Sequence, residues 1–462
     1  MRAQQRCLTV FAVAMGASAV SFAGLLAQDA PPLTLDEALS TAGVGNPEVR
    51  QAVNQLSLNE PERWNFLFGE LMPSVSLNVF STGYNGNLQR RATDNFGNPI
   101  ASPTADWVYF SNTQQSLSLN WQIQGRSIFN AVDRREQTVN ERELALDAAR
   151  WSLGTEVQQQ FFEAQEQQEL LDVERSLLDG RRVDLESARL RFEVADASQV
   201  DVLDAEVQVT QQEITIERQR ATLEQALLQL RQTLGGEEVA AITPQPLPVF
   251  DPADLDEETL IRTALTRNPD LQAAEVDLRG ARIGVRESNE AWWPTLNLQY
   301  NFSRTSQDTE TQALLDFSYD EQDFGSRFFV QLSVPAFNDF FGMRQQQASS
   351  RVQLANQEVQ VEQQRLQVEV TVRAASSALR NEWRTLQLAD RSAEIARRSS
   401  ELAREEYRLG LRTFEELQTT VEQEATARRQ ALASRYAFVT ALLDLESVVG
   451  VRLRPDGLVG VN

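Results

Sequence analysis

The side chains that most often carry enzyme chemistry are nearly absent from this chain of 462 residues. It has no histidine and no lysine, and its only cysteine is Cys7. These absences exclude Ser-His-Asp and Cys-His catalysis, imidazole or thiolate zinc sites, Schiff bases and P-loop lysines. Paired carboxylates remain available for acid–base work, because 66 residues are acidic. We expect no enzyme activity, no cofactor and no metal site, and a carboxylate enzyme such as a glycosidase is the open alternative.

The charge balance limits the partners as well. All 43 basic residues are arginine, and the formal net charge is −23 with a pI of about 4.6. A surface this acidic repels the phosphate backbone, so we expect no nucleic-acid binding. The length is enough for two or three ordinary domains and a sizeable core.

Residues 1–27 have the pattern of an export signal. Arg2 and Arg6 precede an uncharged apolar run, and small residues near Ala23 and Ala27 offer two cleavage sites. The competing interpretation is a membrane anchor, but polar residues and two prolines follow the run directly. No later apolar run is long enough for a transmembrane helix. We therefore expect an exported chain that is soluble or crosses a membrane as strands.

The remaining sequence is one unit written twice. Asn46-Pro47 opens a segment that recurs at Asn268-Pro269, an offset of 222 residues. The first repeat covers residues 28–235 and the second covers 255–450, followed by a tail at 451–462. A proline-rich linker at 236–254 joins them. Each repeat is expected to contain a short helix, two strands and then very long helices.

Four short segments alternate between apolar and polar residues. They lie near 73–80, 116–124, 294–303 and 326–335, and their polar positions are almost all Ser, Asn or Gln. A period of two gives one apolar and one polar face, as in a half-buried soluble sandwich. In an exported chain the pattern fits strands of a membrane barrel better. Trp107 and Trp292-Trp293 lie at strand ends, where aromatic girdles are expected.

The long segments are predicted to be helices with a narrow apolar seam. In the first repeat, apolar residues recur every seven positions from Val157 to Phe192, with Gln, Glu and Arg between them. No proline occurs from Ser127 to Val194, so one helix of about 65 residues would be roughly 100 Å long. Such a thinly apolar helix must pack against similar helices in an elongated bundle or tube.

Closure of the sheet requires more than one chain. Four strands cannot form a membrane barrel, because open edges are not tolerated in lipid and the smallest barrels have about eight strands. Three chains would supply about twelve strands around a water-filled lumen, continued by a tube of helices. The fold class is therefore mainly α with a membrane β-barrel, and the architecture is that of a conduit.

The chain resembles the TolC-like outer membrane efflux protein (outer membrane factor) family. The likeness covers all of the chain after the signal, and its most specific stretches are Tyr407–Glu416 and the first-repeat counterpart that begins at Phe192. It implies a homotrimer with a twelve-stranded barrel in the outer membrane and an α-helical barrel in the periplasm. Such proteins are exit ducts of tripartite efflux pumps or type I secretion systems. A periplasmic adaptor (membrane fusion) protein opens the tip, and the inner-membrane transporter is of RND or ABC type.

The resemblance also implies roles for residues at the periplasmic tips. Asp201, Tyr407 and Arg412 match a hydrogen-bonded gate that links neighbouring coils. Glu416 matches an acidic constriction ring, to which Asp204 adds charge. Adaptor contacts match the two helical turns, with the residues Val194, Ala195, Asp196, Leu409, Gly410 and Leu411.

The sequence departs from the family pattern of the gate at three positions. Thr419 replaces a second acidic residue, Val200 a hydroxyl, and Ala195 a glycine. Without the resemblance, these scattered charges read as a solvated helix face. The alternative function is a non-conducting coiled-coil structural protein or adhesin anchored by a small barrel, which leaves the duplication unexplained.

Overall fold

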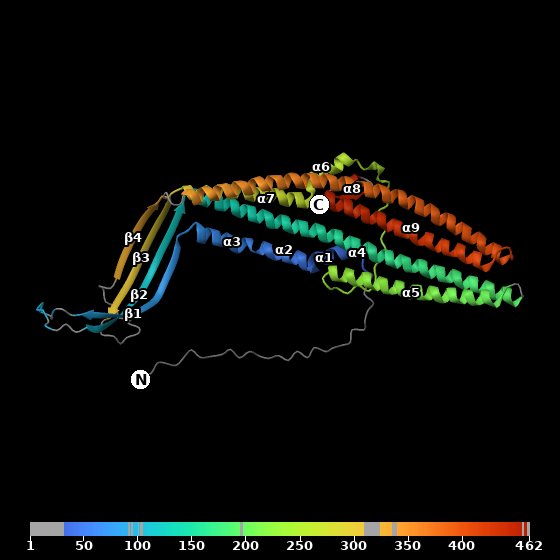
Figure 1. The fold of residues 1–462 in the computed structure, drawn as a ribbon, viewed down its shortest axis with the longest axis horizontal. Coiled ribbons are helices and arrows are strands. Elements are labelled where there is room, and N and C mark those ends of the chain that lie inside the picture. The colour runs from blue at the N-terminus through green and yellow to red at the C-terminus, as the bar shows by residue number, and fades with distance from the viewer. Residues whose placement is uncertain are drawn as a thin grey trace, which may run out of the picture.

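The structure is a computed structural model that describes residues 32–90, 93, 96–99, 101, 105–194, 197–308, 324–334, 340–454 and 457–459. The predicted export signal lies outside these residues. The described part has a sheet at one end and long, nearly parallel helices that extend away from it (Figure 1). Neither this sheet nor the helices form a globule, in agreement with the predicted elongated architecture.

The duplicated order of elements is present in both repeats. The first repeat contains three short helices and a π-helical turn, two strands and two long helices: α1 Leu35–Gly45, α2 Pro47–Ser57, α3 Asn59–Asn65, η1 Phe66–Glu70, β1 Ser74–Arg90, β2 Ala105–Gln124, α4 Ser127–Glu193 and α5 Gln199–Thr233. The second repeat follows the same plan: η2 Pro252–Asp254, α6 Glu257–Arg267, α7 Pro269–Ser288, η3 Glu290–Trp292, β3 Thr295–Asp308, β4 Phe324–Ser333, α8 Phe340–Arg408 and α9 Phe414–Val449. A small hairpin, β5 Arg452–Arg454 and β6 Gly457–Val459, ends the chain.

The repeated Asn-Pro pair has a structural explanation. Asn46 and Asn268 are the N-caps of α2 and α7, and each is followed by proline at the first helical position. Their side-chain amides reach across to the ends of the returning helices. Asn46 donates to the carbonyl of Thr233 at 3.0 Å, and Asn268 donates to that of Val448 at 2.8 Å. Each asparagine thus caps the N-terminus of one helix and donates a hydrogen bond to a backbone carbonyl near the C-terminus of another.

The four strands form one antiparallel sheet in the order β1-β2-β3-β4. The pairing of β1 with β2 continues to Arg90 opposite Ala105, well beyond the predicted segments 73–80 and 116–124. The outer half of β1 is polar and rich in Gly and Asn, and the outer half of β2 contains the unbroken run Trp107-Val108-Tyr109-Phe110, so no period of two marked either. At the other edge, β4 ends at Ser333, short of the predicted 335.

Apolar side chains of the sheet are exposed in the single chain. Val75 and Leu77 in β1 are 66% and 70% exposed, and Phe328 and Leu332 in β4 are 67% and 65% exposed. Burial of such residues is worth roughly 25 cal/mol per Å², so an apolar environment must cover them. Within the described ranges, no helix has the length and apolar character needed to span a bilayer.

The long helices pack in pairs, α4 with α5 and α8 with α9, and α4 also packs against α9. The predicted seam is buried from Val157 to Leu185, which are 0% and 9% exposed. Phe192 does not continue it, because α4 ends one residue later and leaves this ring 46% exposed. The equivalent seam in α8 ends in Tyr407, which is 2% exposed.

The linker joins α5 to α6 and runs across the long helices, about midway along them (Figure 1). The buried amide of Gln165 on α4 holds it by two bonds to the backbone of Gln245, at 2.9 and 3.0 Å. Ile242 also pairs with Leu33 in a parallel bridge. A polar side chain in the helical seam therefore fixes where the second repeat begins.

Candidate functional site

The two tips predicted to be functional lie together at the end of the molecule farthest from the sheet (Figure 1). The first tip is the turn between α4 and α5, residues 194–198. The second tip is the turn between α8 and α9, residues 409–413. Leu185, Ala205, Tyr407 and Leu417, one from each helix, belong to a single apolar cluster below these turns. Packing of all four helices thus positions both tips.

Backbone hydrogen bonds define the second tip. Gly410 has a φ of +75°, which favours glycine, and its N–H donates to the carbonyl of Tyr407 at 3.0 Å. The N–H of Leu411 donates to the carbonyl of Glu406 at 2.9 Å, which completes a Schellman motif. The next helix then starts at a capping box, in which Thr413 and Glu416 bond each other's backbone N–H.

The first tip has the same device at its second helix. Ser198 and Asp201 form a capping box at the start of α5. Asp201 and Glu416, predicted to be gate and ring residues, are therefore equivalent N3 positions in the two repeats. Val194 in this turn is 73% exposed. Ala195 and Asp196, two of the predicted adaptor contacts, lie outside the described residues.

Tyr407 is the buried centre of the second tip. Its ring lies 5.7 Å from that of Phe414, and the Arg191 guanidinium stacks over it at 4.5 Å. Arg191 also donates to the Tyr407 carbonyl at 2.8 Å, and no motif in the sequence indicated this partner. Burial raises the pKa of Tyr407, Arg191 opposes this, and the nearby Asp201 carboxylate raises it further. Among the described residues, the Tyr407 hydroxyl has no hydrogen-bond partner.

Arg412 is held within its own hairpin. Its Nε donates to Glu406 at 2.9 Å and its Nη1 donates to Thr420 at 3.3 Å. The predicted bond from Arg412 to Asp201 is not formed within the single chain, where Asp201 bonds Ser198 instead. A guanidinium has five N–H donors, so Arg412 can bond another carboxylate without losing these partners.

The predicted acidic ring residues are exposed. Asp204 has no ion-pair partner in the described part of the chain, and Glu416 uses one carboxylate oxygen, Oε2, to cap α9. Hydrogen bonds from the backbone and side chain of Thr413 lower the pKa of Glu416, so this group is charged at neutral pH. Both carboxylates can therefore contribute negative charge at the tip.

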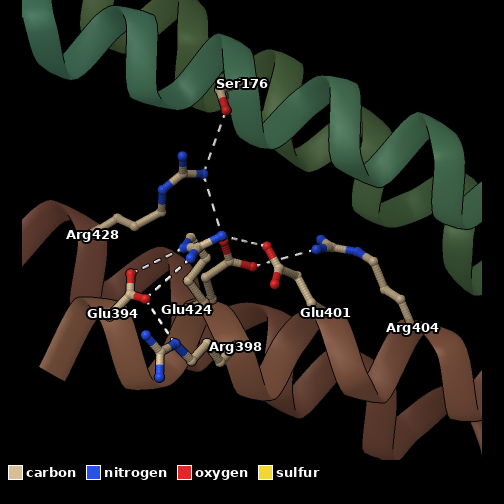
Figure 2. A network of polar contacts seen from close by, with 8 residues as sticks. Ser176, Glu394, Arg398, Glu401, Arg404, Glu424 and Arg428 are labelled. Atoms are coloured by element: carbon tan, nitrogen blue, oxygen red, sulfur yellow. Dashed lines mark hydrogen bonds and ion pairs between the residues drawn. The ribbon is translucent and has the colours of Figure 1, made fainter.

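Deeper in the bundle, charged side chains are buried beside the apolar seam. We call Glu174, Arg181, Asp184, Arg404, Glu424 and Arg429 the buried ionic network. Figure 2 shows the side of it where Arg404 on α8 approaches Glu424 on α9 at 3.4 Å. Arg428 reaches from α9 to Ser176 on α4 at 3.4 Å. Arg404 also pairs with Asp184 on α4 at 3.2 Å, so the network ties both helical pairs together.

The strongest pair of this network joins α4 to α9. Arg429 donates to both oxygens of Glu174, at 2.6 and 3.0 Å, and the Glu174 side chain is only 3% exposed. Gln212 on α5 adds a bond to Glu174 at 2.6 Å. Burial alone raises the pKa of Glu174, but the bonds from Arg429 and Gln212 outweigh it and the net pKa is lowered. Glu174 is thus a buried carboxylate kept charged by its partners.

Comparison with known proteins identifies the class. The sequence profile of the family described as outer membrane efflux protein (OEP) matches residues 70–236 and 260–451. Both repeats are covered, and the match takes in the strands, the long helices and both tips. The chain belongs to the outer membrane efflux protein family. Among curated proteins, no sequence matches this chain.

Solved structures have the same fold at low sequence identity. A membrane protein from Pseudomonas aeruginosa is 19% identical with a TM-score of 0.73, and the match covers 90% of each chain. The CmeC outer membrane channel of Campylobacter jejuni is 15% identical with a TM-score of 0.70, covering 90% of this chain and 85% of that one. The MtrE outer membrane channel of Neisseria gonorrhoeae is 15% identical with a TM-score of 0.68, covering 91% and 89%.

The family and the fold together define what the protein does. It is a TolC-type outer membrane efflux channel and not an enzyme. The predicted duplicated, mainly helical fold with four strands, the efflux-channel function and the location in the outer membrane are confirmed. The alternatives of a non-conducting stalk and a carboxylate enzyme are wrong. Family members act in tripartite efflux pumps.

Proposed function

We propose that this efflux channel works as a homotrimer whose sheets close into a twelve-stranded barrel. The observation that carries the proposal is a four-stranded sheet with an exposed apolar face and two open edges, β1 and β4. Edges with unpaired backbone groups are too costly in lipid, so β1 must pair with β4 of a neighbouring chain. Three chains then bring the helices together as a periplasmic tube.

The tips act as the gate of this tube. In the closed state, Arg412 uses its free guanidinium nitrogen to bond Asp201 across neighbouring coils, and the Tyr407 hydroxyl donates to the same carboxylate. Three facts support this: Arg412 has a spare Nη2, Asp201 has a spare oxygen, and the Tyr407 hydroxyl is unpartnered among the described residues. Threefold symmetry repeats each bond, which at about 1 to 3 kcal/mol apiece holds the tube closed. Glu416 and Asp204 form the acidic ring at the constriction.

A periplasmic adaptor opens the gate by binding the open tips more tightly than the closed ones. The second tip offers it an apolar surface, because Leu409 and Leu411 are 65% and 75% exposed on either side of Gly410. At the first tip, Val194 is equally exposed. The transporter that supplies cargo through the adaptor is of RND or ABC type, and the duct serves drug efflux or type I secretion accordingly.

Single-channel conductance in planar bilayers tests the gate. Arg412→Ser and Asp201→Ala each remove one bond from all three chains, so each should raise conductance several-fold while native mass measurement still finds a trimer. Arg408→Ser is the matched control, because Arg408 lies in the same helix end and its link to Glu405 is 3.6 Å long and exposed. If both gate variants conduct like the parent, these residues are only a solvated helix face. A stable monomer in detergent would refute the trimer itself.

A further inference from the structure

The four strands begin or end together at the helical side of the sheet. Thr295 at the start of β3 pairs with Gln124 at the end of β2 and with Ser333 at the end of β4. Ser74 at the start of β1 pairs with Asn120 of β2. The described connections of β1, β2 and β3 to the helices therefore lie at this one end of the sheet (Figure 1).

Exposed aromatic rings occupy these connections. Trp64 and Phe68 are each 56% exposed and stack on each other with centroids 5.6 Å apart. Phe129 on α4, Trp293 before β3 and Phe341 on α8 are 68%, 51% and 74% exposed. Aromatic rings prefer the headgroup level of a membrane, where one part of the ring is apolar and another is wet. The edge thus has the composition of a membrane–water boundary.

Three exposed arginines accompany these rings, and we call Arg63, Arg126 and Arg344 the junction arginines. Each lies within one helical turn of an aromatic residue, and the Arg344 guanidinium is 5.5 Å from the Phe340 ring centre. In the described part of the chain, none of the three forms an ion pair. Glu60, one turn before Arg63, does not pair with it.

Three of the neighbouring carboxylates are engaged by other arginines, and a fourth, Glu290, accepts a bond from the Asn130 amide. Glu62 pairs with Arg142 at 2.6 Å, and Asp133 pairs with Arg286 at 2.7 Å. Glu287 pairs with Arg134 at 2.5 Å. The junction arginines are therefore left as unneutralised cations beside apolar rings, on a chain with a net charge of −23.

We propose that the junction arginines bind the phosphate of anionic phospholipids, such as phosphatidylglycerol, in the periplasmic leaflet of the outer membrane. Guanidinium groups recognise phosphate by charge-assisted, bidentate bonds, and the adjacent rings contact the glycerol and upper acyl region. The overall negative charge of the protein repels an anionic membrane surface. The junction arginines offset this repulsion locally, where the sheet meets the lipid headgroups. This inference rests on the proposed placement of the helices in the periplasm.

Native mass spectrometry of the full-length protein tests the proposal. The purified assembly is equilibrated with equal amounts of phosphatidylglycerol and phosphatidylcholine, and the retained lipids are counted. The parent should prefer phosphatidylglycerol, and Arg63→Gln, Arg126→Gln and Arg344→Gln combined should lose it, by about fivefold per arginine. Replacing all three by lysine should keep most of the preference. Equal retention of both lipids by the parent would overturn the proposal.

Matched controls separate the other outcomes. Arg218→Gln, Arg384→Gln and Arg391→Gln remove three exposed arginines from the long helices, and lipid preference should not change. Displacement of phosphatidylglycerol by millimolar inorganic phosphate would indicate a free-anion site and overturn the proposal. Failure of the glutamine variant to assemble would show that the arginines form contacts between subunits. This outcome would also overturn the proposal. The mass of the assembly is read from the same spectra, so a monomeric parent would refute the proposed trimer without affecting the lipid result.

Discussion

The pair between Glu174 and Arg429 gives the sharpest prediction about the helical tube. Arg429→Met leaves Glu174 buried without its bidentate partner, and breaking one side of a buried pair costs about 3 to 5 kcal/mol. Because Gln212 still donates to Glu174 and the Arg429 side chain is 31% exposed, the lower value of about 3 kcal/mol applies. Since 1.36 kcal/mol is a factor of ten, local opening should increase about a hundredfold.

Hydrogen exchange measured by mass spectrometry reports this opening. Amides of α4 around Glu174 and of α9 around Arg429 should exchange about a hundredfold faster in Arg429→Met, while peptides from the sheet should not change. Combining Glu174→Leu with Arg429→Met should restore slow exchange, because apolar residues often replace a buried pair without loss. Gln212 then keeps its 3.0 Å bond to the backbone carbonyl of residue 174.

An exposed ion pair provides the control for these hydrogen-exchange measurements. Arg373 and Glu369 are 2.8 Å apart on α8, and their side chains are 52% and 40% exposed. Arg373→Met should change local exchange by less than about threefold, because exposed pairs contribute little. If Arg429→Met exchanges like the parent, or if the double variant with Glu174→Leu exchanges as fast as the single one, the buried pair does not hold α4 to α9.

Three further predictions concern charge, backbone and pH. Glu416→Gln retains the capping box but removes the ring charge, so block of conductance by trivalent cations from the tip side should be lost. Gly410→Ala forces a side chain into a φ of +75°, and faster hydrogen exchange in the second tip should show a cost of about 1 kcal/mol. Burial beside Glu163 and Glu169 raises the pKa of Glu166 to about 7. The folded chain therefore binds a proton at Glu166 that the unfolded chain releases, so this group's contribution to stability should fall as pH rises from about 5 to 7. Glu166→Gln removes that contribution, so over this pH range the melting temperature of the variant should fall less than that of the parent.

Much of the fold was predictable because its signals are periodic. A period of two marked β1 up to Asn78. From Ser81 on, the residues of β1 are mainly polar or Gly, and they pair with a stretch of β2 that contains Trp107-Val108-Tyr109-Phe110 and does not alternate. A period of seven marked the seam, which is buried from Val157 to Leu185. The second seam position in each heptad holds Glu174 and Arg181, also seven apart, and charges there do not reveal burial until their partners on other helices are known.

The candidate site was predictable in position but not in bonding. The Tyr407–Glu416 stretch marked the second tip, and both capping boxes are legible in the sequence as Ser198 with Asp201 and Thr413 with Glu416. Partners on separate helices carry no such local signal. Arg191 over Tyr407 depends on how α4 meets α8, which the spacing of residues along one helix does not determine.

The capping boxes and the Schellman motif at the tips affect how well the duct withstands repeated opening. At the second tip, the backbone of the turn is satisfied by its own hairpin, since Gly410 and Leu411 donate to α8 and Thr413 exchanges bonds with Glu416. Such a turn can swing as a solid lever about the distant bundle without unravelling. In the gating that we propose, opening then needs no loss of helical order and exposes no unfolded backbone to proteases. We therefore expect such a duct to open and close many times in a protease-rich compartment with little proteolysis at its tips.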